Sequence, residues 1–107
     1  MEAALIEKFS HYLRRGDSYF KERRFEDAYD SYMDGLYTLG AYLMYRDMGM
    51  LIPQRELTGF LESRYPEIYD IILRFSSLSH FEEESVRALR DELQRLRGVM
   101  TSPSSEG

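Results

Sequence analysis

The sequence contains no cysteine and no tryptophan, and its 107 residues include only two histidines and three prolines. The absence of cysteine excludes disulfide frameworks, thiolate zinc sites, iron–sulfur clusters and a cysteine nucleophile. The two histidines, His11 and His80, are too few for a histidine-rich metal site. Apolar runs are no longer than five residues, so the sequence predicts neither a membrane span nor a secretory signal. We therefore expect a soluble, cytoplasmic protein.

Length and charge narrow the class further. A chain of 107 residues supports one domain with a core that needs neither a disulfide nor a metal. We expect a single domain over residues 1–99, followed by a disordered polar tail at 100–107. The net charge of -5 argues against a general nucleic-acid coat, although local basic patches are compatible with it. No metal and no cofactor are expected.

Apolar residues recur at helical spacing along almost the whole chain. The strongest stripe, from Phe25 to Leu43, has intervals of three and four residues, which is the period of one face of an α-helix. No segment shows the alternation typical of a β-strand. The predicted helices span 2–23, 25–47, 54–64, 67–75 and 80–98. We therefore expect an all-α fold, a four- to five-helix up-down bundle whose first two helices form a long antiparallel hairpin.

The predicted boundaries rest on residues that start or stop helices. Gly49 and Pro53 end the second helix, and Pro66 occupies the first position of the fourth helix. Ser79 and Glu82 have the spacing of a capping box, in which each side chain bonds a free backbone amide of the other residue. This capping box predicts the start of the last helix.

Tyrosine and arginine are abundant, and both are typical of buried interfaces. There are nine tyrosines, and all but two of the 14 basic residues are arginine. Tyr29, Tyr37, Tyr42 and Tyr45 lie off the apolar stripe of the second helix, so one expectation is an exposed tyrosine-rich face. The alternative is an ordinary core with additional tyrosines at its rim.

Most sets of residues that carry known chemistry are missing. The sequence has no glycine-rich phosphate loop, zinc-protease motif, calcium loop or nucleophile elbow. Glu26, Asp27, Asp30 and Asp34 share one side of the second helix. A divalent-ion site usually needs carboxylates from several helices, so we interpret these acids as an exposed stripe relieved by arginines.

The remaining candidate is the pair Arg74 and His80, which lies at the break before the last helix. Histidine acts as a general base near neutral pH, and arginine binds a phosphate and stabilises its developing charge. The pair is chemically sufficient for metal-independent cleavage of RNA, with the ribose 2′-hydroxyl as nucleophile. The alternative is that His80 only occupies the first turn of the last helix while Arg74 pairs with a nearby carboxylate.

Three features of the chain indicate a known family: the order of the helices, the sequence F-E-D-A at the start of the second helix and the pattern Arg-x5-His before the last helix. On these features the chain resembles the HEPN superfamily over residues 4–99. These small helical domains carry an Arg, four to six residues, and then a His. The resemblance implies that Arg74 and His80 are the catalytic residues of a homodimeric ribonuclease, with the two pairs facing each other across the dimer. It also allows an inactive relative, and many members are toxins paired with a nucleotidyltransferase antitoxin. Phe75 follows Arg74 where most members have a polar residue.

A second resemblance concerns the first helical hairpin. Six residues match the spacing of one tetratricopeptide-type repeat: Gly16, Tyr19, Phe20, Ala28, Tyr32 and Leu36. In that family these positions pack two helices together, and stacked repeats bind peptides. Only one copy is visible here, whereas stacking needs three or more, so we interpret the match as shared hairpin packing. It supports the alternative function, a non-enzymatic interaction module that self-associates through the tyrosine-rich face.

The partners follow from these two interpretations. Both predict a homodimer and are compatible with a further protein partner. RNA is a partner in the ribonuclease interpretation only. Neither interpretation predicts binding to DNA or to a membrane.

Overall fold

Five helices account for most of the chain. The computed structural model describes residues 2–51 and 53–101. Its helices are α1 (Glu2–Lys21), α2 (Phe25–Met48), α3 (Gln54–Arg64), α4 (Pro66–Ser76) and α5 (Glu83–Thr101). The described residues contain no strand, and none of their helices is long and apolar enough to cross a membrane. The predicted all-α bundle is confirmed, and every predicted helix end lies within three residues of the observed one.

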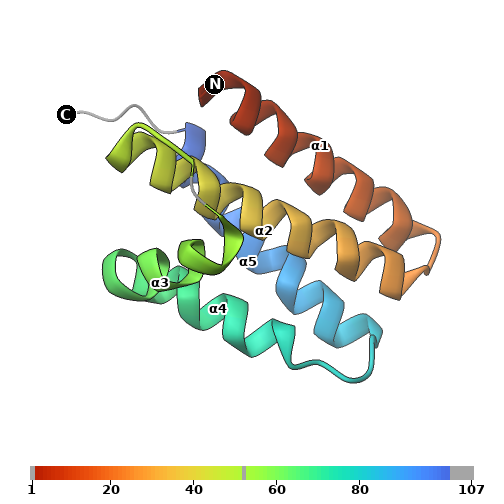
Figure 1. The fold of residues 1–107 in the computed structure, drawn as a ribbon. Coiled ribbons are helices and arrows are strands. Elements are labelled where there is room, and N and C mark those ends of the chain that lie inside the picture. The colour runs from red at the N-terminus through yellow and green to blue at the C-terminus, as the bar shows by residue number, and fades with distance from the viewer. Residues whose placement is uncertain (1, 52, 102–107) are drawn as a thin grey trace.

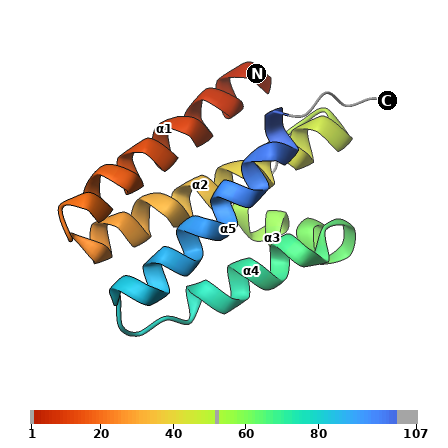
Figure 2. The ribbon, with the colours of Figure 1, turned by 180° about the vertical axis from the view of Figure 1, so that it is seen from behind.

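The helix α2 is the centre of the bundle. It forms an antiparallel hairpin with α1, and α3, α4 and α5 also pack against it (Figure 1). Seen from behind, α5 runs along α2 between α1 and α4 (Figure 2). The turn between α1 and α2 and the loop between α4 and α5 lie at the same end of the bundle, where Arg23 and Glu83 form an ion pair of 3.4 Å.

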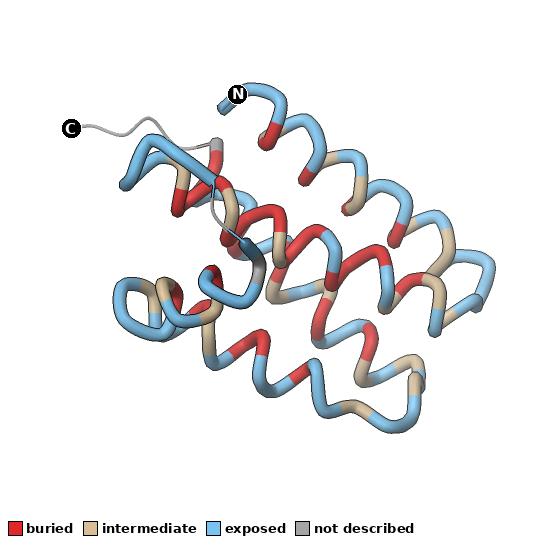
Figure 3. The backbone as a smooth tube through the Cα atoms, in the orientation of Figure 1, coloured by how far each residue is buried: buried red, intermediate tan, exposed pale blue. Residues whose placement is uncertain are grey.

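The core surrounds α2 because apolar side chains lie on most of its circumference. The buried positions run along α2 and along the facing sides of its neighbours (Figure 3). The predicted stripe is confirmed, since all of its residues except the half-buried Phe25 are inaccessible to solvent. These buried residues are Ala28, Tyr32, Leu36, Leu39 and Leu43.

Two of the predicted helix ends have the expected local causes. Gly49 adopts a left-handed conformation with φ of 77°, and its N–H donates to the carbonyl of Tyr45 at 2.7 Å. A left-handed backbone favours glycine because other residues carry a Cβ that is crowded there. Pro66 opens α4, where its missing N–H costs no helical hydrogen bond.

The tyrosines of α2 do not form an exposed face, so that expectation is wrong. Tyr42 is buried, and Tyr29, Tyr37 and Tyr45 are half-buried against the core. These rings pack against the core because α2 contacts all four other helices. Tyr37 also lines a surface pocket, and self-association through this side of α2 stays a prediction.

The last helix begins three residues later than predicted. The carbonyl of Glu82 accepts the N–H of Val86 at 3.0 Å, and Ser79 lies outside the helix. The predicted capping box is therefore wrong. Phe81 packs its ring against that of Tyr29, with 4.7 Å between the centroids. This contact holds the chain before α5 against α2, in a non-helical conformation.

The helix α5 also ends three residues later than predicted. It continues through Thr101, and Met100 is buried in the core. Residues 100 and 101 therefore belong to the bundle rather than to the predicted tail. The remaining tail positions, 102–107, lie outside the described residues.

Candidate functional site

Arg74 lies in the last turn of α4, and its guanidinium is bound to α5. Its Nη2 donates to Oε2 of Glu92 at 2.7 Å. Its guanidinium carbon lies 4.7 Å from the centroid of the Phe75 ring. Arg74 therefore pairs with a nearby carboxylate, as the structural alternative predicted.

The carboxylate of Glu92 is shared between two arginines. Its Oε1 accepts hydrogen bonds from Nη2 and Nε of Arg95 at 2.7 and 3.2 Å, and Arg95 also lies 2.9 Å from Glu67 on α4. The hydrogen bonds from Arg95 and then from Arg74 hold the pKa of Glu92 below its ordinary value. Glu92 is thus ionised at neutral pH, and an RNA phosphate has to displace it in order to reach Arg74 in this position.

His80 lies in the loop between α4 and α5, not in the first turn of α5. It is exposed, and no hydrogen bond or ion pair involves it within the described residues. Glu92 lies nine residues beyond the start of α5, about 14 Å along the helix axis. Because Arg74 is held at that point, the single chain does not bring Arg74 and His80 together.

Phe75 belongs to the core, and the chain around it is fixed by its neighbours. It is buried at 4% exposure, and its carbonyl accepts the hydroxyl of Tyr29 at 2.8 Å. The hydroxyl of Ser77 donates to the carbonyl of Arg74 at 3.1 Å. The apolar residue after Arg74 therefore has a structural role, because it anchors the end of α4 to α2.

The acidic stripe of α2 is exposed, as predicted, but arginine side chains compensate only part of its negative charge. Arg24 lies 2.7 Å from Asp27, whereas no ion pair or hydrogen bond reaches the carboxylates of Asp30 and Asp34 within the described residues. Burial, and then the charges of Asp27 and Asp34, raise the pKa of Asp30. Among the described residues, no group of three or more His, Asp or Glu side chains is arranged to hold a metal ion.

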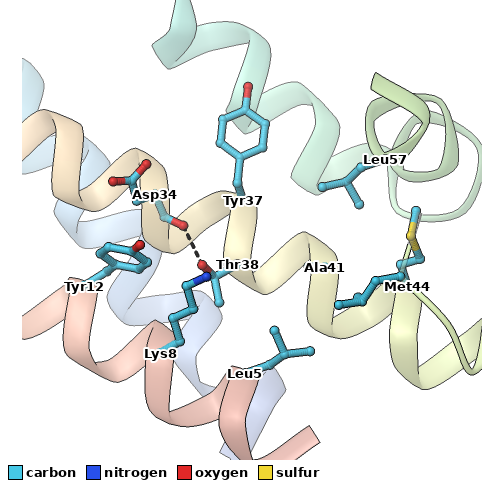
Figure 4. Close-up of a pocket in the computed structure, with 10 residues that line it drawn as sticks. Leu5, Lys8, Tyr12, Asp34, Tyr37, Thr38, Ala41, Met44 and Leu57 are labelled. Atoms are coloured by element: carbon cyan, nitrogen blue, oxygen red, sulfur yellow. Dashed lines mark hydrogen bonds between the residues drawn. The ribbon is translucent and has the colours of Figure 1, made fainter. Parts of the chain in front are cut away.

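A groove of about 310 Å³ opens between α1, α2 and the start of α3 (Figure 4). We call it the α1–α3 groove, and it is lined by Leu5, Lys8, Tyr12, Asp34, Tyr37, Thr38, Ala41, Met44, Leu51 and Leu57. Its floor is mainly apolar and its rim carries charges and hydroxyls. The Thr38 hydroxyl donates to the carbonyl of Asp34 at 2.7 Å, so its proton is already engaged within α2.

Three exposed apolar side chains lie near this groove in the chain, and one of them, Leu51, lines it. Met48, Met50 and Leu51 are 48%, 54% and 44% exposed, and they lie where α2 ends and the chain turns toward α3. The sequence did not predict this groove, because the groove depends on the gap between α1 and α3. The one available signal was the apolar run around Gly49, since a predicted turn lies at the surface.

Comparison of the chain with protein-family models, with curated proteins and with solved structures finds no match. The resemblances to HEPN domains and to a tetratricopeptide-type hairpin therefore stay predictions, carried by the residues quoted above.

Proposed function

We propose that the chain is a HEPN-like helical domain without enzymatic activity of its own, and that it functions by binding another protein. The observation that carries this proposal is the α1–α3 groove with the exposed Met48, Met50 and Leu51 near it in the chain. Apolar surface rimmed by polar side chains is typical of protein-binding sites. Methionine suits such a surface because its flexible side chain adapts to its partner.

The state of the predicted catalytic pair supports a non-enzymatic role. Arg74 is hydrogen-bonded to an ionised Glu92, and His80 lies in a loop away from that contact. A ribonuclease needs its arginine to be available to the phosphate and its histidine to be within reach of the 2′-hydroxyl. Within one chain, Glu92 competes with a phosphate for Arg74, and no hydrogen bond or ion pair involves His80 among the described residues.

The shape of the groove fits one helix of a partner. From Asp34 to Met44 it follows ten residues of α2, about 15 Å or three helical turns. Apolar side chains spaced three and four residues apart on an incoming helix fill such a floor. Lys8 and Asp34 at the rim carry opposite charges, which fix the direction in which that helix binds. The HEPN resemblance implies a partner of the toxin–antitoxin type.

A charge placed in the floor of the groove tests the proposal. Ala41→Arg introduces a large cation into the floor, while Ala88→Arg makes the same change at an exposed position of α5. We expect one or more proteins of the native host to co-purify with the wild-type chain and with Ala88→Arg. The same proteins should not co-purify with Ala41→Arg. Thermal unfolding of both variants shows that the bundle is retained. Identical sets of proteins for all three chains would contradict the proposal.

A metal-independent ribonuclease assembled across a homodimer is the second candidate. It is favoured by the accessibility of Arg74, whose side chain is 58% exposed, and of the exposed His80. A second copy of the chain is able to approach both residues along this edge of the bundle. The pairs then complete each other between subunits, as the resemblance implies.

An RNA-cleavage assay in the presence of a chelator tests the ribonuclease. His80→Ala abolishes cleavage if the candidate is correct, while His11→Ala on the outer face of α1 leaves it unchanged. Glu92→Gln increases cleavage, because it removes the charge that competes with phosphate for Arg74. Equal behaviour of the wild type and His80→Ala would exclude this candidate.

A further inference from the structure

We propose that a cationic trough along the outer side of α1 binds the phosphodiester backbone of a single-stranded nucleic acid. The trough consists of three adjoining hollows of about 430, 310 and 400 Å³. The first two share Arg14, and the last two share Asp17 and Lys21. From Glu7 to Lys21 the trough follows 14 residues of α1, about 21 Å.

The trough is lined by four cationic side chains against three carboxylates. Lys8, Arg14 and Lys21 line it, and none of them has an ion pair or a hydrogen bond within the described residues. The binding of each phosphate to such a cation releases counterions, which is the main source of affinity for nucleic-acid backbones. These three cations stand out in a chain whose net charge is -5.

Three carboxylates also line the trough, and two of them already have partners. Oδ1 of Asp17 accepts the hydroxyl of Tyr32 at 2.5 Å, and Asp91 lies 3.4 Å from Arg90. Glu7 lies at the far end, beside Lys8 and His11. The Tyr32 hydroxyl is neutral and leaves the charge of Asp17 in place, so the middle of the trough carries the two cations Arg14 and Lys21 against one carboxylate.

A guanidinium from α5 completes the trough at its other end. The guanidinium carbon of Arg90 lies 5.0 Å from the centroid of the Phe20 ring, and that of Arg87 lies 5.7 Å from it. The ring face attracts both cations and limits their movement. Nη2 of Arg90 also donates to Asp91 at 3.4 Å, and Nη2 of Arg87 donates to Glu83. The remaining N–H groups of Arg90, which lines the trough, are those that a phosphate oxygen can reach.

The lining of the trough favours a nucleic acid over an acidic segment of a protein. Only Ala4 and Phe20 contribute apolar side chains, whereas the centre of a protein interface is enriched in apolar and aromatic residues. Interfaces with nucleic acids are more polar and more positively charged. Ser18 and Gln94 add neutral groups that donate hydrogen bonds to sugar and base atoms.

This surface shares Lys8 with the α1–α3 groove, and its other lining residues differ from those of the groove. The trough follows α1 and reaches Arg90, Asp91 and Gln94 of α5, while the groove opens toward α3. The inference therefore goes beyond the proposed protein-binding function and does not depend on it.

Fluorescence anisotropy with labelled oligonucleotides of about 12 residues tests the trough, since one single-strand site covers roughly 4–16 nucleotides. Parallel measurements with RNA and with DNA of the same sequence show which of the two nucleic acids the trough binds more tightly. Arg14→Glu is expected to weaken binding by roughly fivefold or more and to flatten its salt dependence. Arg55→Glu is the matched control, because Arg55 is an exposed helical arginine of α3 that likewise has no ion pair within the described residues. It is expected to change binding by less than about twofold.

Three results would overturn the inference. The first is that the wild-type chain binds neither oligonucleotide at low salt. The second is that both variants weaken binding equally, and the third is that poly-glutamate competes as well as the oligonucleotide does. The last result assigns the trough to an acidic protein instead. The experiment with Ala41→Arg stays independent, because that substitution does not touch the trough.

Discussion

The ring of Tyr32 lies directly against the backbone of Gly16, so closely that a Cβ built on Gly16 would be 2.4 Å from Cε1 of that ring. The ring is inaccessible to solvent. Gly16 thus allows α1 to pack onto the largest side chain in the core. This contact belongs to the hairpin packing that the tetratricopeptide-like spacing predicted.

We expect Gly16→Ala to destabilise the protein by about 1–3 kcal/mol, as overpacking of a core usually does. The clash outweighs the gain of about 1 kcal/mol that alanine brings to a helix interior. Urea denaturation measures the difference. Gly59→Ala is the control, because nothing lies within 4 Å of the added Cβ. It should stabilise the protein slightly. A stabilised Gly16→Ala would show that the ring is free to move away.

The hydroxyl of Tyr32 provides a second test of the same contact. It donates to Asp17 at 2.5 Å, so Tyr32→Phe should cost about 1–2 kcal/mol of unfolding free energy at neutral pH. Burial, and then the hydrogen bond to Asp17, raise the pKa of Tyr32 above its ordinary value of 10. Above about pH 10 the unfolded chain releases this proton while the folded chain keeps it. Stability is therefore fully present below pH 10 and declines as the pH rises.

Urea denaturation from about pH 8 to about pH 11 checks this prediction. Tyr32→Phe should lose less stability over this range than the wild type does. Tyr37→Phe is the matched control, because no hydrogen bond of its hydroxyl is found within the described residues. It should follow the wild type. Parallel curves for all three proteins would rule out Tyr32 as the source of the alkaline loss.

The network around Glu92 predicts a pH dependence of the opposite sign. Arg95 and Arg74 lower the pKa of Glu92 in the folded state, so its contribution is present above the unfolded value of about 4.3 and is lost as the pH falls. Because both arginines are more than half exposed, Glu92→Gln should cost no more than about 1 kcal/mol at neutral pH.

Denaturation at about pH 7 and about pH 3 measures the contribution of Glu92. The difference between the wild type and Glu92→Gln should shrink at the lower pH and in high salt, since salt screens exposed charges. Glu56→Gln, an exposed acid of α3, serves as the control. A difference that persists at low pH would mean that the carboxylate acts through packing rather than through its charge.

The helices were predictable because their causes are local. The stripe from Phe25 to Leu43 determines which side of α2 is buried, and Gly49 and Pro66 fix helix ends through their own backbone chemistry. The start of α5 was not predictable in this way. It depends on the packing of Phe81 against Tyr29, a residue of another helix.

The candidate site shows the same division. Sequence spacing identified Arg74 and His80 as residues with suitable chemistry. It could not show that Arg74 bonds Glu92, which is 18 residues away on α5. The α1–α3 groove and the cationic trough were missed for the same reason, since both combine residues of helices that are distant in sequence.

The sequence by itself determined the all-α class, the positions of the helices and the hairpin between the first two, because hydrophobic periodicity and turn residues act within a few residues. The tertiary structure alone decided that the tyrosines of α2 pack against the core, that Arg74 pairs with Glu92, and that cations of α1 and α5 share one trough. Each of these depends on which helices pack against each other. The arrangement of the helices is determined by the packing of all the buried side chains together.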